Sequence, residues 1–202
     1  MKKLILLLFA ISLFSCSSDS KETEPIVEDN FIRAADMSYL PLTESEGTIY
    51  KNNNISENAL TTLKNAGCNT IRVRLWKNPI NAHSGFNEVK TFAQRIKQAG
   101  MKVWLTVHYS DTWADPANQE KPADWASLNF TNLKTEVANY TTQIMTEINP
   151  DIIQIGNETN DGMLWPEGKI TTNESQYVQL VQSAVAAVRT KSSTTKIMLH
   201  YA

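Results

Sequence analysis

The sequence predicts an α/β protein, a parallel (β/α)8 (TIM) barrel truncated after about the fifth strand. Short β-branched runs alternate with stretches whose apolar residues recur at helical spacing, which is typical of repeated strand–helix units. The units repeat about every 30 to 45 residues, as in barrels. No glycine-rich turn follows the first expected strand, which argues against an open dinucleotide-binding sheet.

Each expected element follows from a local pattern. The strands are short runs rich in β-branched and aliphatic residues, at 31–37, 70–76, 101–108, 152–155 and 196–200. Four helices are predicted from stripes of apolar residues at helical spacing. The stripes consist of Ala59, Leu60 and Leu63; of Val89, Phe92, Ala93 and Ile96; of Leu133, Val137, Tyr140, Ile144 and Ile148; and of Tyr177, Leu180, Val181, Ala184, Val185 and Val188. We expect Ser56 to cap the first helix. Gly67, Gly100 and Pro150 end the first three helices.

The first residues predict export. A basic Met1-Lys2-Lys3 segment precedes an apolar run, residues 4–14, that is too short to span a bilayer. The run ends at Leu13-Phe14-Ser15-Cys16, which resembles the lipobox of bacterial lipoproteins and implies cleavage before Cys16 and acylation of that residue. A plain secretory signal is the alternative.

Three regions follow from this interpretation. We expect a lipoprotein signal peptide at residues 1–15, a flexible acidic tether at 16–30, and a partial barrel domain at 31–202. The lipid at Cys16 is the only expected contact with a membrane. The protein is therefore expected to be an exported bacterial lipoprotein at the outer membrane or the cell surface.

Composition gives no reason to expect a nucleic-acid partner, a disulfide or a metal. The 202 residues carry a net charge of −2 and are 42% hydrophobic, as in an ordinary globular domain, so nothing favours a nucleic-acid partner. With Cys16 assigned to lipid, Cys68 has no intrachain disulfide partner and is expected to be a small buried residue. No residue cluster has metal-ligand spacing, and we expect neither a metal nor a cofactor.

Two arginines lie in the second expected strand. Alternation places Arg72, Arg74 and Trp76 on one face of this strand. Arginines inside a barrel are costly unless they are paired, and pairing with a catalytic carboxylate would keep that carboxylate ionised. The alternative is that both reach solvent or bind structural acids.

A glutamate follows the fourth expected strand. The run 152–155 stops at Gly156, and Asn157 and Glu158 come next. In a parallel barrel the carboxyl ends of the strands carry the chemistry. A Glu beside an amide that can bind a sugar hydroxyl is suited to be the general acid/base of a retaining glycosidase. A helix-capping Glu, or one paired with a lysine, is the alternative.

Polar and aromatic residues also follow the third and fifth strands. His108 ends the third strand, and Asp111, Trp113 and Asp115 follow it. Aromatic faces stack on the C–H surfaces of sugar rings, and carboxylates and amides bind hydroxyls. This loop therefore indicates a sugar site. The fifth strand ends at His200, and His83 is assigned no role.

Several runs resemble the motifs of glycoside hydrolase family 53, the endo-β-1,4-galactanases that act on type I arabinogalactan. The runs lie at 71–79 (IRVRLWKNP), 108–116 (HYSDTWADP) and 156–160 (GNETN). Shorter matches lie at 35–38 (ADMS) and 199–201 (LHY), so that the similarity extends from about Phe31 to Ala202. The resemblance implies a barrel of glycosidase clan A and a plant galactan or arabinogalactan as substrate.

The resemblance also implies roles for single residues. Glu158 matches the family's general acid/base, and Asn157 the residue that contacts the substrate's 2-hydroxyl. Arg74, His108 and His200 match active-site positions. Asp111, Trp113 and Asp115 match the substrate-binding loop.

The family's nucleophile is a second Glu at the end of the seventh barrel strand, and the sequence given has no counterpart. We therefore expect a fragment that is inactive by itself. A surface lipoprotein that binds glycans without turnover is the alternative.

Overall fold

The computed structural model describes residues 31–202. The chain divides into two units, Met1–Phe31 and Ile32–Ala202, and the fold below is that of the second. The predicted signal peptide, the tether and Cys16 lie outside the described residues. None of the helices in the described part is both long enough and apolar enough to cross a membrane.

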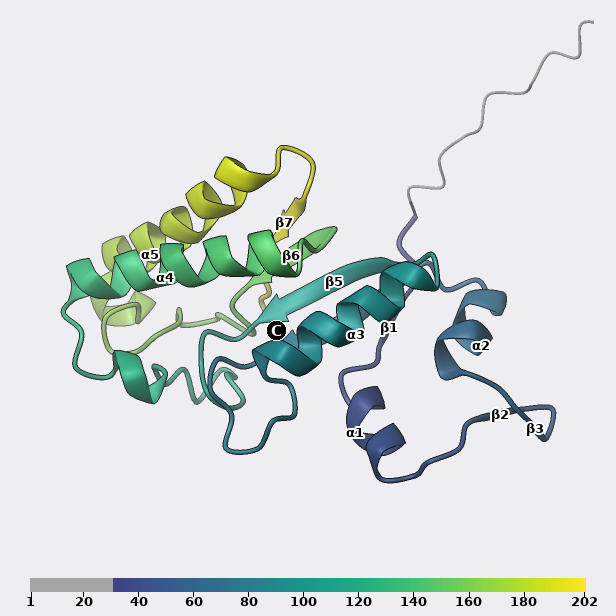
Figure 1. Ribbon diagram of the computed structural model, residues 1–202. Coiled ribbons are helices and arrows are strands. Elements are labelled where there is room, and N and C mark those ends of the chain that lie inside the picture. Colours follow the sequence, from purple (N-terminus) through teal and green to yellow (C-terminus); the bar gives the residue numbers. More distant parts are fainter. Residues whose placement is uncertain (1–30) are drawn as a thin grey trace, which may run out of the picture. The chain divides into compact units, whose positions relative to one another are not determined.

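A five-stranded parallel sheet forms the centre of the second unit (Figure 1). Its strands are β1 (Ala34–Asp36), β4 (Thr70–Leu75), β5 (Lys102–Val107), β6 (Ile152–Ile155) and β7 (Lys196–Met198). They are neighbours in the order in which they occur along the chain, β1-β4-β5-β6-β7, and every pairing is parallel. This is the winding of a (β/α) barrel, and the five predicted strands are confirmed.

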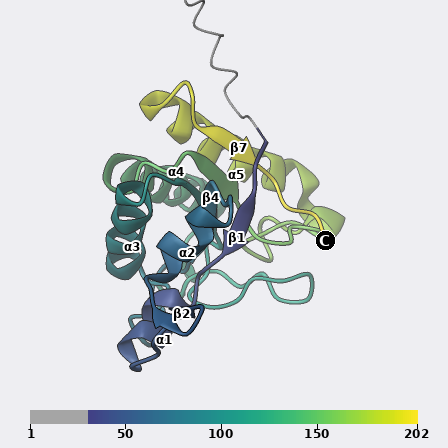
Figure 2. The ribbon, with the colours of Figure 1, turned by 90° about the vertical axis from the view of Figure 1, so that its right-hand side faces the viewer.

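Helices connect successive strands, and Figure 2 shows the sheet and its helices from one end. The helices between strands are α2 (Ala59–Asn65), α3 (Phe86–Gln98), α4 (Phe130–Glu147) and α5 (Ile170–Lys191). Helix α3 packs against β4 and β5, and α4 packs against α5. Each predicted stripe lies on one of these helices, except that Ile148 is the C-cap residue just after α4.

Four short elements precede α2 or interrupt a loop, and the sequence pattern does not predict them. They are α1 (Leu40–Ser45), the antiparallel pair β2 (Lys51–Asn52) and β3 (Ile55–Ser56), and a 3-10 turn at Ala123–Trp125. The prediction that Ser56 caps α2 is wrong, because Ser56 pairs within the β2–β3 hairpin. The cap is Asn58, whose side chain accepts a hydrogen bond from the Leu60 N–H at 2.9 Å.

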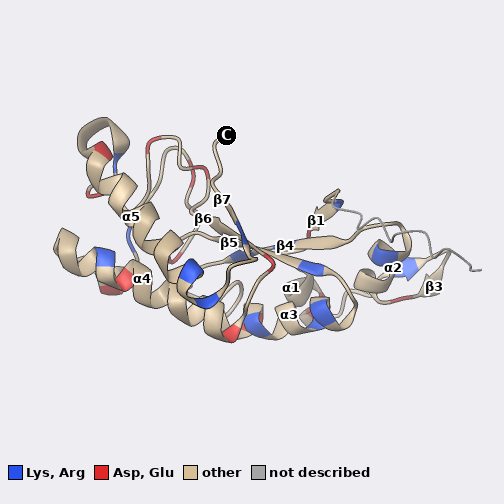
Figure 3. Ribbon diagram, turned by 90° about the horizontal axis from the view of Figure 1, so that it is seen from above, with Lys and Arg blue, Asp and Glu red and all other residues tan. Residues whose placement is uncertain are grey.

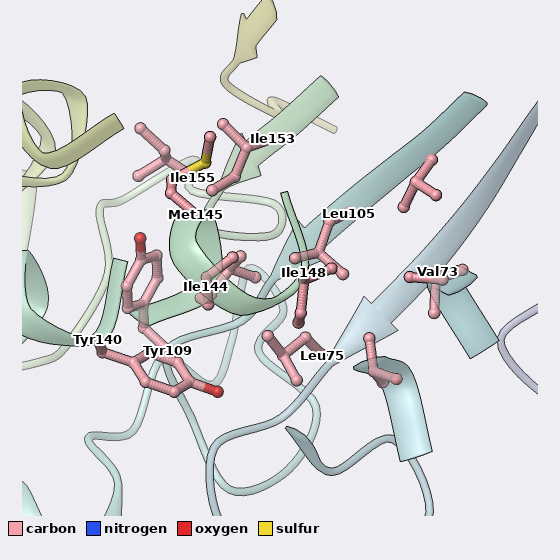
Figure 4. Packing of buried hydrophobic residues seen from close by; sticks show 14 of the residues in the cluster. Val73, Leu75, Leu105, Tyr109, Tyr140, Ile144, Met145, Ile148, Ile153 and Ile155 are labelled. Carbon is pink, nitrogen blue, oxygen red and sulfur yellow. The ribbon is translucent and has the colours of Figure 1, made fainter. Parts of the chain in front are cut away.

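The apolar core lies between the sheet and the helices. Figure 4 shows Leu75, Leu105 and Ile155 from the strands beside Ile144 of α4 and Ile148, the C-cap residue of that helix. All five are at most 3% exposed. Burying each such side chain contributes about 1.5–3 kcal/mol. The strands therefore present their aliphatic residues to the helices, which leaves the alternate positions to polar residues.

Those alternate positions form a polar row across the sheet. Arg74 is in register with Thr106, and Thr106 with Gln154. The Thr106 hydroxyl donates to Gln154 Oε1 at 3.3 Å. This face leads to the carboxyl ends of the strands, where the candidate site lies.

Charged residues of both signs are interspersed over the helices of the described unit (Figure 3). Lys90 pairs with Glu147, and Arg95 with Glu44, each at 2.8 Å. The free Cys68 is half-buried rather than fully buried, and its thiol lies 3.1 Å from the Arg33 carbonyl.

Candidate active site

The candidate site lies at the carboxyl ends of β4, β5, β6 and β7. Because the strands are parallel, these ends meet at one edge of the sheet. Trp76 follows β4, His108 follows β5, Glu158 comes three residues after β6, and His200 two residues after β7. Contacts between these segments bring the predicted residues together.

Glu158 is half-buried and has its side chain free. Its backbone is in the left-handed region, with φ at 48°. Its N–H donates to His200 Nδ1 at 3.3 Å, which joins the ends of β6 and β7. Within residues 31–202 its carboxylate makes neither a hydrogen bond nor an ion pair, and it neither caps a helix nor pairs with a lysine. The carboxylate is thus available to a ligand.

Asn157 has a fixed amide orientation and is only 3% exposed. Its Oδ1 accepts a hydrogen bond from Arg72 Nη2 at 3.1 Å and lies 3.2 Å from His200 Nδ1. Its Nδ2 donates to the Ala114 carbonyl at 2.8 Å. An amide nitrogen carries two hydrogens, so one remains for a ligand hydroxyl.

Arg72 pairs with a structural acid. Its Nη1 lies 2.5 Å from Asp36 Oδ2 on β1. Burial raises the pKa of Asp36, but hydrogen bonds from Ser38 and Arg72 outweigh this effect, and the pKa lies below its ordinary value. Asp36 therefore stays ionised. Arg72 thus binds a structural acid, since its partner is Asp36 and not Glu158.

Arg74 is enclosed by aromatic rings. It is 4% exposed, and its Nε donates to the Ser84 hydroxyl at 2.9 Å. The guanidinium carbon lies 4.5 Å from the ring centroid of Tyr39 and 4.4 Å from those of Trp76 and Trp113. Cation–π attraction takes the place of a carboxylate partner, since Arg74 forms no ion pair within the described part of the chain.

His108 is held as a neutral ring. It is 2% exposed, and its Nδ1 accepts the Ala114 N–H at 3.1 Å, so the ring proton resides on Nε2. Burial lowers the pKa of His108 to about 3, and the positive charges of Arg74 and Arg72 contribute to this lowering. Its ring also lies edge-on to Trp113, with centroids 5.6 Å apart. A neutral imidazole can donate a hydrogen bond without carrying charge.

The loop after β5 uses its two predicted carboxylates internally. Asp111 accepts the N–H groups of Asn78 and Ala123, each at 2.9 Å. Asp115 accepts those of Ala117 at 2.8 Å and Asn118 at 2.9 Å. Both carboxylates therefore brace the loop.

The same loop presents Trp113 to solvent. The residue is 45% exposed. Its ring also lies 5.6 Å from that of Trp76. Trp113 is thus anchored by aromatic neighbours on one side and open on another, as a sugar-stacking surface requires.

The site also contains residues that the sequence pattern did not single out. Tyr39 and Ser84 contact the guanidinium of Arg74, and Gln119 donates to backbone carbonyls of Asn157 and Glu158. All three lie in loops or short turns, where no periodicity marks a residue.

His83, to which the sequence assigns no role, pairs with Glu88 at 2.8 Å. Among residues 31–202 no group of three or more His, Cys, Asp or Glu side chains could hold a metal ion.

Comparison with known proteins identifies the family. The family profile of glycosyl hydrolase family 53 matches residues 32–202. An arabinogalactan endo-β-1,4-galactanase A of Aspergillus niger is 37% identical over 176 residues, covering 83% of this chain and 50% of that protein. An arabinogalactan endo-β-1,4-galactanase of Thermothelomyces thermophilus is 38% identical over 176 residues, covering 83% of this chain and 52% of that protein.

Solved structures agree. The family 53 catalytic domain of Ignisphaera aggregans superposes with a TM-score of 0.81 at 36% identity, covering 88% of this chain and 53% of that one. The chain spans about half the length of the curated relatives it matches. With the family profile matched from residue 32 to residue 202 and the barrel-type sheet in place, the chain belongs to glycosyl hydrolase family 53.

Proposed function

We propose that the complete protein carrying this chain is an arabinogalactan endo-β-1,4-galactanase, a retaining glycosidase that cleaves type I arabinogalactan internally. The observation that carries the proposal is the free carboxylate of Glu158 beside the fixed amide of Asn157, at the strand ends of a family 53 fold. The names of the fungal relatives support the choice of substrate.

Glu158 is assigned the general acid/base role. In a retaining mechanism such a residue first protonates the departing glycosidic oxygen and then removes a proton from the attacking water. The remaining hydrogen on Asn157 Nδ2 is assigned to the 2-hydroxyl of the sugar. Asn157 suits this role because Arg72 and the Ala114 carbonyl already fix its amide.

The nucleophile is not assigned to the described residues. Retention requires a second carboxyl group about 5–5.5 Å from the first. In the five-stranded sheet, Glu158 is the one glutamate within three residues after a strand. Asp36 is engaged with Arg72. We therefore assign only the acid/base half of the catalytic pair to this chain, and the second Glu to the rest of the barrel.

Substrate binding is assigned to the surrounding side chains. The exposed ring of Trp113 stacks on a galactose ring, and His108 donates from Nε2 to a sugar hydroxyl. Arg74 and His200 are the other polar side chains assigned to substrate binding. Asp111 and Asp115 act by bracing the loop that presents Trp113.

An extracellular polysaccharide requires an exported enzyme. The N-terminal pattern that ends at Cys16 supports an exported lipoprotein anchored by lipid at the outer membrane or cell surface. Such an anchor would hold the catalytic domain where large glycans are accessible.

The test is product analysis with the complete protein on linear β-1,4-galactan. NMR of the first minutes should show new reducing ends as the β-anomer, together with oligosaccharides of intermediate length. The α-anomer as first product would contradict retention, and galactose alone would contradict endo cleavage. Tight binding without any turnover would instead favour a glycan-binding lipoprotein.

A further inference from the structure

Gln119 is a buried amide that contacts the backbone on both sides of Glu158. The residue is 2% exposed and lies in the loop after β5. Its Nε2 donates to the carbonyl of Asn157 at 2.8 Å, to that of Glu158 at 3.2 Å and to that of Asp115 at 3.0 Å. Because all three partners are carbonyl oxygens, the atom that faces them must be the nitrogen.

These contacts restrain the conformation of Glu158 directly. The Asn157 carbonyl belongs to the peptide plane before the Glu158 Cα, and the Glu158 carbonyl to the plane after it. Holding both planes fixes φ and ψ of Glu158. Its φ of 48° lies in the left-handed region, which a residue other than glycine rarely adopts without outside support.

The opposite side of the same segment is held by the residues that follow β7. The Glu158 N–H donates to His200 Nδ1 at 3.3 Å, and the Thr159 N–H donates to the His200 carbonyl at 2.9 Å. Gln119 is itself anchored, because its carbonyl accepts the Trp165 N–H at 2.8 Å. The Glu158 backbone is therefore clamped between the loop after β5 and the end of β7.

The oxygen of the Gln119 amide indicates that the residue serves as a hydrogen-bond donor. Its Oε1 is buried and has no hydrogen-bond partner within the part of the chain described. A buried unpaired acceptor destabilises the fold. An apolar side chain of similar length would avoid that cost, but it could not donate to the three carbonyls.

We propose that Gln119 is a positioning residue for the acid/base. It holds Glu158 in the left-handed conformation that directs its carboxyl group to the glycosidic oxygen. The inference deepens the proposed function and rests on the assignment of Glu158. Without the amide, the peptide planes on both sides of Glu158 lose their donor and the carboxyl group moves away from the oxygen it protonates.

The test compares two substrates in the complete protein. Gln119→Met keeps the length of the side chain and removes both donors. Its kcat/KM on β-1,4-galactan should fall about 10- to 100-fold, the usual effect of a small misplacement. On an aryl β-1,4-galactobioside with a good leaving group, kcat/KM should fall no more than about threefold, because such a group departs without a proton.

Thr141→Val is the matched control. Thr141 lies on α4 and is fully buried, and its hydroxyl bonds to Tyr109 at 2.7 Å and to the Val137 carbonyl at 2.7 Å, and to neither Gln119 nor Glu158. This variant should lower the melting temperature and leave the ratio of the two activities unchanged. Glu158→Gln, measured alongside, should show the same substrate dependence as Gln119→Met in a stronger form.

The outcomes separate the two claims. In the first case Glu158→Gln loses activity selectively on galactan. Equal losses on both substrates in Gln119→Met, or no loss on either, would then overturn the positioning role alone. Equal losses in Glu158→Gln would overturn the acid/base assignment and this inference with it. If Gln119→Met does not fold, Gln119→Glu is the second variant. Its galactan activity, relative to the aryl substrate, should recover as the pH falls and the new carboxyl gains a proton to donate, and a constant ratio would contradict the role.

Discussion

His108 and Arg74 are two nitrogen-bearing side chains that are both buried in the site, and they do not repel each other. Arg74 keeps its charge because three aromatic rings surround its guanidinium. His108 stays neutral because burial and the neighbouring arginines disfavour its protonation. Both contact Trp113, so the ring assigned to the substrate lies on a rigid base.

His108 should make the stability of the protein sensitive to acid. Its pKa is about 3 in the folded protein and has its ordinary value of 6.5 in the unfolded chain, so between these values the unfolded chain binds a proton that the folded one does not. The contribution of the neutral His108 to the free energy of unfolding is therefore complete above pH 6.5. It is lost as the pH falls toward 3, at up to about 1.4 kcal/mol per pH unit. In His108→Gln this part of the slope should vanish.

Chemical unfolding of the complete protein at about pH 7, 5.5 and 4 measures this effect, since these values span the range in which the two states bind different numbers of protons. Asp36 adds to the slope near pH 4 in both proteins, because its pKa is lowered in the fold from the ordinary value of 3.8, and the comparison with His108→Gln removes this shared part. Equal slopes for wild type and His108→Gln would show that the pKa of His108 is the same in the folded protein and in the unfolded chain.

Residues at strand ends were predictable because their position depends on local pattern. Glu158, Asn157, His108 and His200 each follow a recognisable strand, and the parallel winding brings them together. Gln119 was not predictable. It contacts residues 38 and 39 positions away, and no periodicity marks it in its loop.

At the scale of elements, the loop from β6 to α5 folds back on itself beside Glu158. The Met163 N–H donates to the Gly168 carbonyl at 3.1 Å. A Cβ atom on Gly162 would lie 1.8 Å from that carbonyl oxygen, and φ of Gly162 is +89°. Only glycine fits at this position.

Gly162→Ala should therefore destabilise the protein by about 3 kcal/mol or more, since both the backbone conformation and the contact are unfavourable. Gly47→Ala is the control. Gly47 has φ at +85° but no atom within 4 Å of its added Cβ, so only the backbone cost of about 1–2 kcal/mol applies. Thermal and chemical unfolding measure both variants, and equal losses would mean that the loop relaxes around the new methyl group.

Long elements were predictable and short ones were not. The stripes on α3 and α4 are long enough to reveal their period, and their residues pack in the core. Helix α1 has only 6 residues, of which Leu40 alone is buried, and each strand of the β2–β3 hairpin has 2 residues. Such elements depend on their tertiary surroundings, so the local pattern does not distinguish Ser56, which pairs in the hairpin, from a helix cap.

At the scale of the whole molecule, the five strands place at the site one carboxylate that we assign to catalysis, that of Glu158. β1 and β7 each have a single neighbouring strand among the described residues. The family and the winding were predictable from the motifs, because their spacing follows the strand–helix repeat. The partner of Arg72 was not, since Asp36 and Arg72 lie 36 residues apart.

Residues 31–202 expressed alone should not hydrolyse galactan. Glu158 can supply a proton, but a covalent intermediate needs a second carboxylate. Release of reducing ends from β-1,4-galactan, compared with the complete protein, measures this. Turnover within about tenfold of the complete protein would contradict the two-carboxylate mechanism.

The central claim is that Glu158 is the acid/base of a retaining galactanase. Its most direct test is kcat/KM of Glu158→Gln, in the complete protein, on a series of aryl β-1,4-galactobiosides whose leaving groups range from poor to good. For poor leaving groups and for galactan, we predict losses of about 10²–10⁴-fold, because proton donation is lost. For the best leaving group we predict near wild-type glycosylation. A uniform loss across the series, with the fold intact, would contradict the assignment.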